Sequence, residues 1–202
     1  TGDKVLVAIG VRGRYDGLFD DSLGLEIERD HIKVNRGTYK TNLPGVYATG
    51  DVIGPPWLAH VASEEAIACV EIIAGHKATP VHYGQVPGCT YCQPQVASVG
   101  LTEQACKDKG IEYKVGKFPF TASGKAQALG ETTGFVKIIS DPKYGEILGV
   151  HMIGEGVTEL IAEMGLAMRL EATVEEVIAT MHAHPTLSEA VHEAALDAGD
   201  RM

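Results

Sequence analysis

The feature that most constrains this chain is a C-terminal run that reads Met181-His182-Ala183-His184-Pro185-Thr186-Leu187-Ser188-Glu189. Because a proline disfavours the helical conformation of the residue before it, His184 is predicted to lie in extended backbone. Thr186 and Glu189 have the spacing of a capping box, which predicts a helix that begins near Thr186. The fold must therefore place His184 just outside the N-terminus of a helix that carries Glu189 in its first turn.

This spacing is suited to a proton-transfer pair. The Glu189 carboxylate could bond one ring nitrogen of His184 and leave the other nitrogen free to take a proton from a thiol or hydroxyl. Two simpler alternatives stay open: Glu189 could be only a helix cap, and His184 could be an ordinary buried histidine. His182 is a rival for the base, although its place in the preceding helical pattern favours a packing role.

A second segment far upstream adds to this pattern. Val46–Val52 is a short apolar run, predicted to be a strand, that contains Gly50-Asp51, and Gly54-Pro55-Pro56 follows it. Taken with the His184 to Glu189 run, it resembles the flavoprotein disulfide reductases, or pyridine nucleotide-disulfide oxidoreductases, and among them the dihydrolipoamide dehydrogenases. That family's Gly-x-Gly-x-x-Gly turn and redox-active cysteine pair are not found in this sequence. The chain is therefore expected to be the C-terminal portion of such an enzyme.

The resemblance implies an activity. A family member oxidises protein-bound dihydrolipoamide with FAD and NAD⁺, His184 would be the base, and Glu189 would orient it across a homodimer. The implied partner is a lipoyl-bearing acyltransferase or lipoyl protein of a 2-oxoacid dehydrogenase or glycine cleavage complex. Two alternatives remain: an isolated dimerisation or docking module without activity, and the same part of a glutathione or mercuric reductase.

The resemblance also implies cofactor-binding residues. Asp51 would accept a hydrogen bond from the ribityl chain of the flavin, and the backbone of Gly10 would approach the dinucleotide. A plain turn at Gly10 is the alternative. Four consecutive residues at a helix N-terminus would lie beside the isoalloxazine: Trp57, Leu58, Ala59 and His60. Unpaired N–H groups and the positive end of the helix dipole suit an electron-rich ring there, whereas the Trp57 side chain could simply pack.

Periodicity predicts the elements of two regions. The first region has a buried strand at Lys4–Gly10, a hairpin formed by 25–27 and 32–34, and a helix from Trp57 to Gly75. The second has a strand at 89–99, a helix at 102–109 closed by Gly110, strands near 113–120, 134–140 and 146–153, and then three helices. A stripe formed by Ile161, Met164 and Met168 is predicted to be core, in part interfacial.

These elements predict an α+β fold. The family resemblance implies a C-terminal interface or dimerisation domain with an antiparallel sheet and helices, preceded by a partial FAD/NAD-binding α/β segment. The predicted boundaries are 1–15 for the end of the NAD-binding domain, 16–82 for the C-terminal part of the FAD-binding domain, and 83–202 for the interface domain.

Composition and charge limit the environments and the partners that are compatible with this sequence. The 202 residues are 45% hydrophobic, which allows a buried core, and the net charge of −10 argues against nucleic acid or an anionic membrane as a partner. No apolar run reaches the ~20 residues of a membrane span, and the N-terminus does not resemble a signal peptide. The expected location is cytoplasmic, or the mitochondrial matrix in a eukaryote.

The Cys-x-x-Cys motif at Cys89 and Cys92 is not predicted to be a redox pair. In a continuous strand over 89–99, residues three apart point to opposite faces, so the two sulfurs could neither pair nor share a metal. No second Cys or His pair has zinc spacing. No metal site is predicted.

Overall fold

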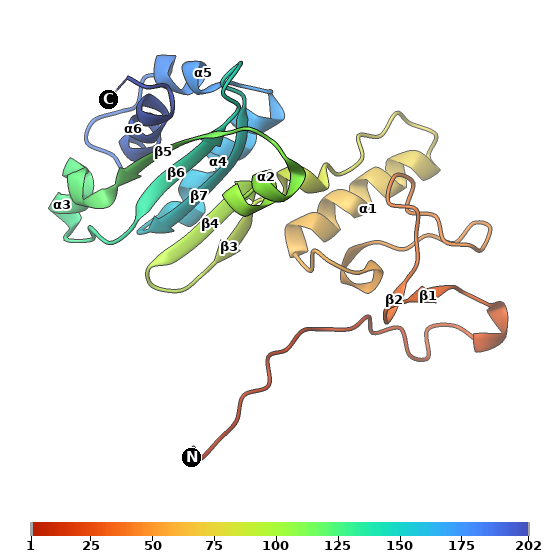
Figure 1. Cartoon of the computed structure of the whole chain (residues 1–202). Helices are drawn as coiled ribbons and strands as arrows, with labels where there is room; N and C mark the ends of the chain where they lie inside the picture. The colour runs from red at the N-terminus through yellow and green to blue at the C-terminus, as the bar shows by residue number, and fades with distance from the viewer. Residues whose placement is uncertain (1, 202) are drawn as a thin grey trace. The chain divides into compact units, whose positions relative to one another are not determined.

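The computed structural model describes residues 2–201, which divide into two compact units with a boundary between His82 and Tyr83 (Figure 1). Each unit has its own buried core. The assignment of residues 1–15, 16–82 and 83–202 to NAD-binding, FAD-binding and interface domains remains a prediction. Within the described residues, no helix is long and apolar enough to cross a membrane.

The first unit is organised around the helix α1. Its elements are η1 (Asp21–Leu23), β1 (Ile27–Glu28), β2 (His31–Ile32), the 3-10 turn η2 (Gly50–Ile53) and α1 (Ala59–Ile73). Strands β1 and β2 pair antiparallel, which confirms the predicted hairpin with shorter strands. A small core packs η2 against α1 and consists of Tyr39, Ile53, Ala68 and Cys69. The predicted helix is also confirmed, although it begins two residues after Trp57.

Two strands predicted in this unit are wrong. Lys4–Gly10 has no strand conformation, and its large apolar side chains are exposed. The run that leads to Gly50 is not a strand either, because its only pairing is an isolated bridge between Tyr47 and Lys40. A buried strand needs neighbours that satisfy its backbone hydrogen bonds. No strand in the described part of this unit pairs with either segment.

The second unit is built on a five-stranded antiparallel sheet with the order β3-β4-β7-β6-β5. The strands are β3 (Gly88–Thr90), β4 (Gln95–Gly100), β5 (Lys114–Pro119), β6 (Phe135–Ser140) and β7 (Ile147–Gly154). Buried and exposed residues alternate along β5, as expected for a strand with one face against a core. The predicted strands near 113–120, 134–140 and 146–153 are confirmed.

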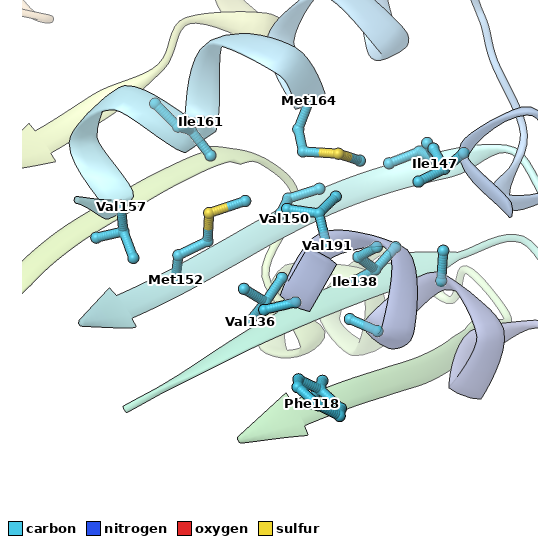
Figure 2. Close-up of a cluster of buried hydrophobic side chains, with 14 of the residues drawn as sticks. Phe118, Val136, Ile138, Ile147, Val150, Met152, Val157, Ile161, Met164 and Val191 are labelled. Carbon is cyan, nitrogen blue, oxygen red and sulfur yellow. The ribbon is translucent and has the colours of Figure 1, made fainter. Parts of the chain in front are cut away.

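The helices of this unit are α2 (Glu103–Lys109), α3 (Gly124–Leu129), α4 (Val157–Arg169), α5 (Val174–Ala179) and α6 (Glu189–Ala198). The core of the unit lies where α4 and α6 pack on the sheet. Helix α4 packs on β4 and β7, α6 packs on β5 and β6, and α5 packs on α6. Figure 2 shows Ile161 and Met164 of α4 turned toward Val150 of β7. The apolar stripe of α4 is therefore core, and the α+β fold class with an antiparallel sheet and helices is confirmed.

Local capping signals explain where several helices begin and end. The Thr102 hydroxyl accepts a hydrogen bond from the Ala105 N–H at 3.0 Å, and Gly110 closes α2 in the left-handed conformation, as predicted. Thr173 and Glu176 form a complete capping box at the start of α5. Helix α3, which Ser123 caps, was not predicted.

The strand predicted at 89–99 is wrong, because the chain reverses within it. Cys89 lies in β3, Cys92 lies in the turn that follows, and β4 pairs back on β3. The opposite-face argument therefore does not apply to these two residues. Both thiols are nevertheless free in the structure.

Candidate active site

The structure brings His184 and Glu189 together. His184 Nδ1 lies 2.8 Å from Glu189 Oε1. The His184 side chain is 77% exposed and the Glu189 side chain 30% exposed, which rules out an ordinary buried histidine. Since a carboxylate can only accept, Nδ1 is the donor in this bond, and the neutral imidazole therefore has an unprotonated Nε2.

The start of α6 differs from the predicted capping box. The helix begins at Glu189 rather than Thr186, and the Thr186 hydroxyl donates to Ala183 O at 2.6 Å instead of capping the helix. The other half of the box does form, because the Thr186 N–H donates to Glu189 Oε2 at 2.9 Å. Each carboxylate oxygen thus has its own donor, and the carboxylate is fixed in orientation toward His184.

These donors favour the ionised form of Glu189. The backbone N–H of Thr186 is the main cause that lowers the pKa of the Glu189 carboxyl below its ordinary value, and the hydrogen bond from His184 is the second. The pair therefore has the electrostatics of a base and its orienting group.

The pair lines a small surface pocket. The pocket has a volume of about 200 Å³, and its walls include Phe118, Ser123, Gly124 and Glu193 in addition to the pair itself. These wall residues come from β5, from the start of α3 and from α6. A small group that entered the pocket would lie next to the imidazole.

His182 has a different environment. Its Nε2 lies 2.8 Å from Glu163 Oε1, its Nδ1 lies 3.0 Å from Thr180 O, and its side chain is only 6% exposed. Because both ring nitrogens are engaged within the chain, neither is available to a substrate. His182 lies after α5, not in a helix, but its burial supports the packing role.

We expect Glu189 to titrate below its ordinary pKa of 4.5 in the wild-type chain. Since the folded-state pKa is lowered, this carboxylate stabilises the fold above the ordinary range, and the contribution is lost as pH falls through the lowered value. The pKa should stay low in His184→Gln, because the Thr186 N–H is the larger cause. NMR titration of the Glu189 carboxyl carbon in the wild type and in His184→Gln measures the two pKa values. A Glu189 pKa that returned to 4.5 in His184→Gln would contradict it.

In the first unit, Asp51 lies on the 3-10 turn η2. Its side chain is exposed, and its carbonyl accepts the N–H of Gly54 at 3.2 Å. Gly50, at the start of the turn, has a φ of 78°, and a Cβ there would lie 3.2 Å from the Cβ of Ala62. A glycine therefore lets the turn lie close against α1. Gly10 also has a positive φ, but it lies in exposed, irregular chain.

The N-terminus of α1 lies next in sequence. Leu58 is its N-cap residue and has no side-chain capping bond, and the backbone N–H groups of the first turn point out of the N-terminal end of the helix. The Trp57 side chain packs, because its Nε1 donates to His31 Nε2 at 3.2 Å and the two rings stack. The exposed Asp51 carboxylate supplies an acceptor and the N-terminal end of α1 supplies donors and a positive dipole end, which together fit a flavin.

Sequence reasoning missed two residues beside Asp51. Glu65 of α1 is a buried carboxylate, and Arg36 pairs with it at 3.3 Å. The available signal was the placement of Glu65 among apolar residues on one face of α1, where Val61, Ala68 and Cys69 are also buried.

Comparison with known families agrees with this architecture. Residues 86–195 match the family described as pyridine nucleotide-disulphide oxidoreductase, dimerisation domain, and residues 1–66 match pyridine nucleotide-disulphide oxidoreductase. The chain therefore belongs to the pyridine nucleotide-disulphide oxidoreductase family. Its second unit contains the dimerisation domain.

Individual relatives within this family are named dihydrolipoyl dehydrogenase. The chain is 52% identical to the dihydrolipoyl dehydrogenase of Rhizobium etli over 100% of its own length and 42% of that protein. It is 46% identical to the mitochondrial dihydrolipoyl dehydrogenase of Pisum sativum, over 98% of the chain and 40% of that protein. The chain thus spans less than half the length of these relatives.

Solved structures show the same fold. LpdA from Mycobacterium tuberculosis superposes with a TM-score of 0.86 at 26% identity, over 93% of this chain and 41% of that one. The flavoprotein disulfide reductase RclA from Escherichia coli superposes with a TM-score of 0.84 at 21% identity, over 91% of this chain and 42% of that one.

Proposed function

We propose that this chain is the C-terminal part of a dihydrolipoyl dehydrogenase that oxidises protein-bound dihydrolipoamide with FAD and NAD⁺. The observation that carries the proposal is the 2.8 Å contact between His184 Nδ1 and Glu189 Oε1, with the imidazole exposed at a pocket. The dihydrolipoyl dehydrogenases with which the chain shares about half of its residues support the substrate class.

The proposed chemistry of the pair is proton transfer. His184 Nε2 takes the proton of a dihydrolipoyl thiol, and Glu189 stabilises the imidazolium that forms. The thiolate then attacks a protein disulfide outside this chain. FAD, when bound, supplies the electron path from the reduced cysteines to NAD⁺. The role of this chain's residues is thus to activate the thiol and to hold the proton.

The cofactor residues are proposed from their placement. Asp51 is exposed on its turn and can accept a hydrogen bond from a ribityl hydroxyl. The N-terminal end of α1, with the positive end of its dipole, suits the electron-rich edge of the flavin, so we assign Trp57, Leu58, Ala59 and His60 through their backbone. Gly10 is proposed to approach the dinucleotide, as part of residues 1–15 of an NAD-binding domain.

We further propose a homodimer in which each subunit gives its His184 and Glu189 to the active site of the other. The dimerisation-domain family of residues 86–195 supports this. The proposed partner is a lipoyl-bearing acyltransferase or lipoyl protein of a 2-oxoacid dehydrogenase or glycine cleavage complex. The proposed location is the cytoplasm, or the mitochondrial matrix in a eukaryote.

The test is a substrate comparison with the complete enzyme. We expect dihydrolipoamide to reduce NAD⁺, followed by NADH absorbance, and glutathione disulfide and mercuric ion to be poor acceptors from NADPH. The reverse preference would assign the chain to one of the other two reductases. Activity with none of these substrates would favour a dimerisation module.

A further inference from the structure

A single ion pair holds both ends of the turn that carries Asp51. At the start of the turn, the Gly50 N–H donates to Glu65 Oε2 at 2.7 Å. At its end, Arg36 Nη2 donates to Ile53 O at 2.9 Å. Arg36 Nη1 and Glu65 Oε1 complete the arrangement with a contact of 3.3 Å. We name these two residues, Arg36 and Glu65, the turn clamp.

The two residues of the turn clamp differ in burial. The Glu65 side chain is 2% exposed and the Arg36 side chain 32% exposed. A buried carboxylate is costly unless hydrogen bonds satisfy it, and here each oxygen has a donor. An apolar side chain at position 65 would fill the same face of α1 but could not bind the Gly50 N–H. The contribution of Glu65 is therefore a fixed geometry between α1 and the turn.

The turn is also restrained where Val52 and Ile53 pack in the small core. It is four residues long, and its N-cap residue, Thr49, makes no side-chain capping bond. Glycines with positive φ flank its centre, at Gly50 and Gly54, and glycine restrains the backbone less than any other residue. The direction of the exposed Asp51 side chain therefore depends on what holds the turn against α1.

We propose that Arg36 and Glu65 are positioning residues that aim Asp51 at the ribityl chain of the flavin. This inference rests on the proposed function, because it assumes that Asp51 binds FAD. The clamp acts through the backbone of Gly50 and Ile53 and touches no cofactor. Its loss therefore weakens FAD binding only through Asp51.

Two measurements on the complete enzyme test the proposal. The first is hydrogen exchange of the Gly50 amide in the apoprotein, and the second is FAD affinity. We expect Glu65→Gln and Arg36→Met each to raise Gly50 exchange and the FAD dissociation constant by about tenfold, because glutamine offers one neutral acceptor oxygen to two donors and methionine removes the guanidinium that bonds both Glu65 and Ile53 O. Glu64→Gln is the matched control, since Glu64 is the exposed neighbour on the same helix, and it should change neither quantity.

A double-mutant cycle separates positioning from a merely structural role. If Glu65 acts through Asp51, Asp51→Asn should weaken FAD binding less in Glu65→Gln than in the wild type. Additive losses would overturn the proposal. Should Arg36→Met not fold, Arg36→Lys keeps the charge beside Glu65 but loses the fork that also reaches Ile53 O. It should still weaken FAD binding, and an unchanged affinity would contradict the clamp.

Different results would overturn the positioning role and the proposed function. Wild-type FAD affinity in Glu65→Gln would overturn the positioning role alone. An apoprotein whose Gly50 amide depends on Glu65 but which binds no FAD would overturn the proposed function, and the positioning role with it.

Discussion

Replacing His184 by glutamine in the complete enzyme should slow oxidation of dihydrolipoamide by about 10²–10⁴-fold, the usual range for loss of a general base. Glutamine can still bond Glu189 but cannot take a proton, so the thiol would have to ionise without help. Flavin content should not change, since the residues proposed to bind the flavin lie in the first unit and His184 belongs to the second. Anaerobic stopped-flow reduction of the flavin by dihydrolipoamide measures the step.

Two variants serve as controls for this result. Glu189→Gln should cause a smaller loss, because the amide oxygen can still accept from His184 Nδ1 but no longer stabilises an imidazolium. His76→Gln should be silent, since His76 is an exposed histidine after α1 in the first unit. If His184→Gln reduced the flavin at the wild-type rate, His184 would not be the base.

Local signals made much of the second unit predictable. Thr102 and Gly110 bracket α2, Thr173 and Glu176 cap α5, and apolar alternation marks the strands of the sheet. Each of these signals acts between residues that are near in sequence. They could therefore be recognised without knowing how the chain folds back on itself.

The errors arise where distant residues decide the structure. The run Lys4–Gly10 has the composition of a buried strand, but a strand also needs neighbours, which its own sequence does not specify. The turn between Cys89 and Gln95 breaks what periodicity presents as one strand. Helix α3, Gly124–Leu129, is too short for a periodic pattern to reveal.

The candidate site residues also fall into contacts that are local in sequence and contacts between distant residues. His184 and Glu189 are five residues apart, so their contact follows from a local turn at the start of α6. Arg36 and Glu65 are separated by 29 positions, and Trp57 and His31 by 26. Those contacts form only once α1 packs against the segments that precede it. Sequence spacing could thus reveal the proposed catalytic pair but not the residues that hold the Asp51 turn.

Gly116→Ala should destabilise the second unit by about 3 kcal/mol or more, at the upper end of the cost of overpacking. Gly116 lies in β5 where α6 crosses it, and a Cβ there would come within 3.0 Å of Ala194 O and Ala198 N. Both atoms belong to the helix backbone, so no side-chain rotation relieves the clash. Helix α6 must move away from the sheet and lose its buried contacts with β5 and β6. Hydrogen exchange of the most protected amides of β6 and β7 measures the loss.

Gly165→Ala is the matched control, because a Cβ at Gly165 in α4 meets nothing within 4 Å. It should leave the second unit unchanged or stabilise it by up to about 1 kcal/mol, since alanine is the better helix former. The Gly116 variant should also disturb the His184 to Glu189 contact, because Glu189 is the first residue of α6. Equal stabilities for the two variants would show that α6 can shift without cost. The packing of α6 on β5 would then not be what fixes Glu189 in front of His184.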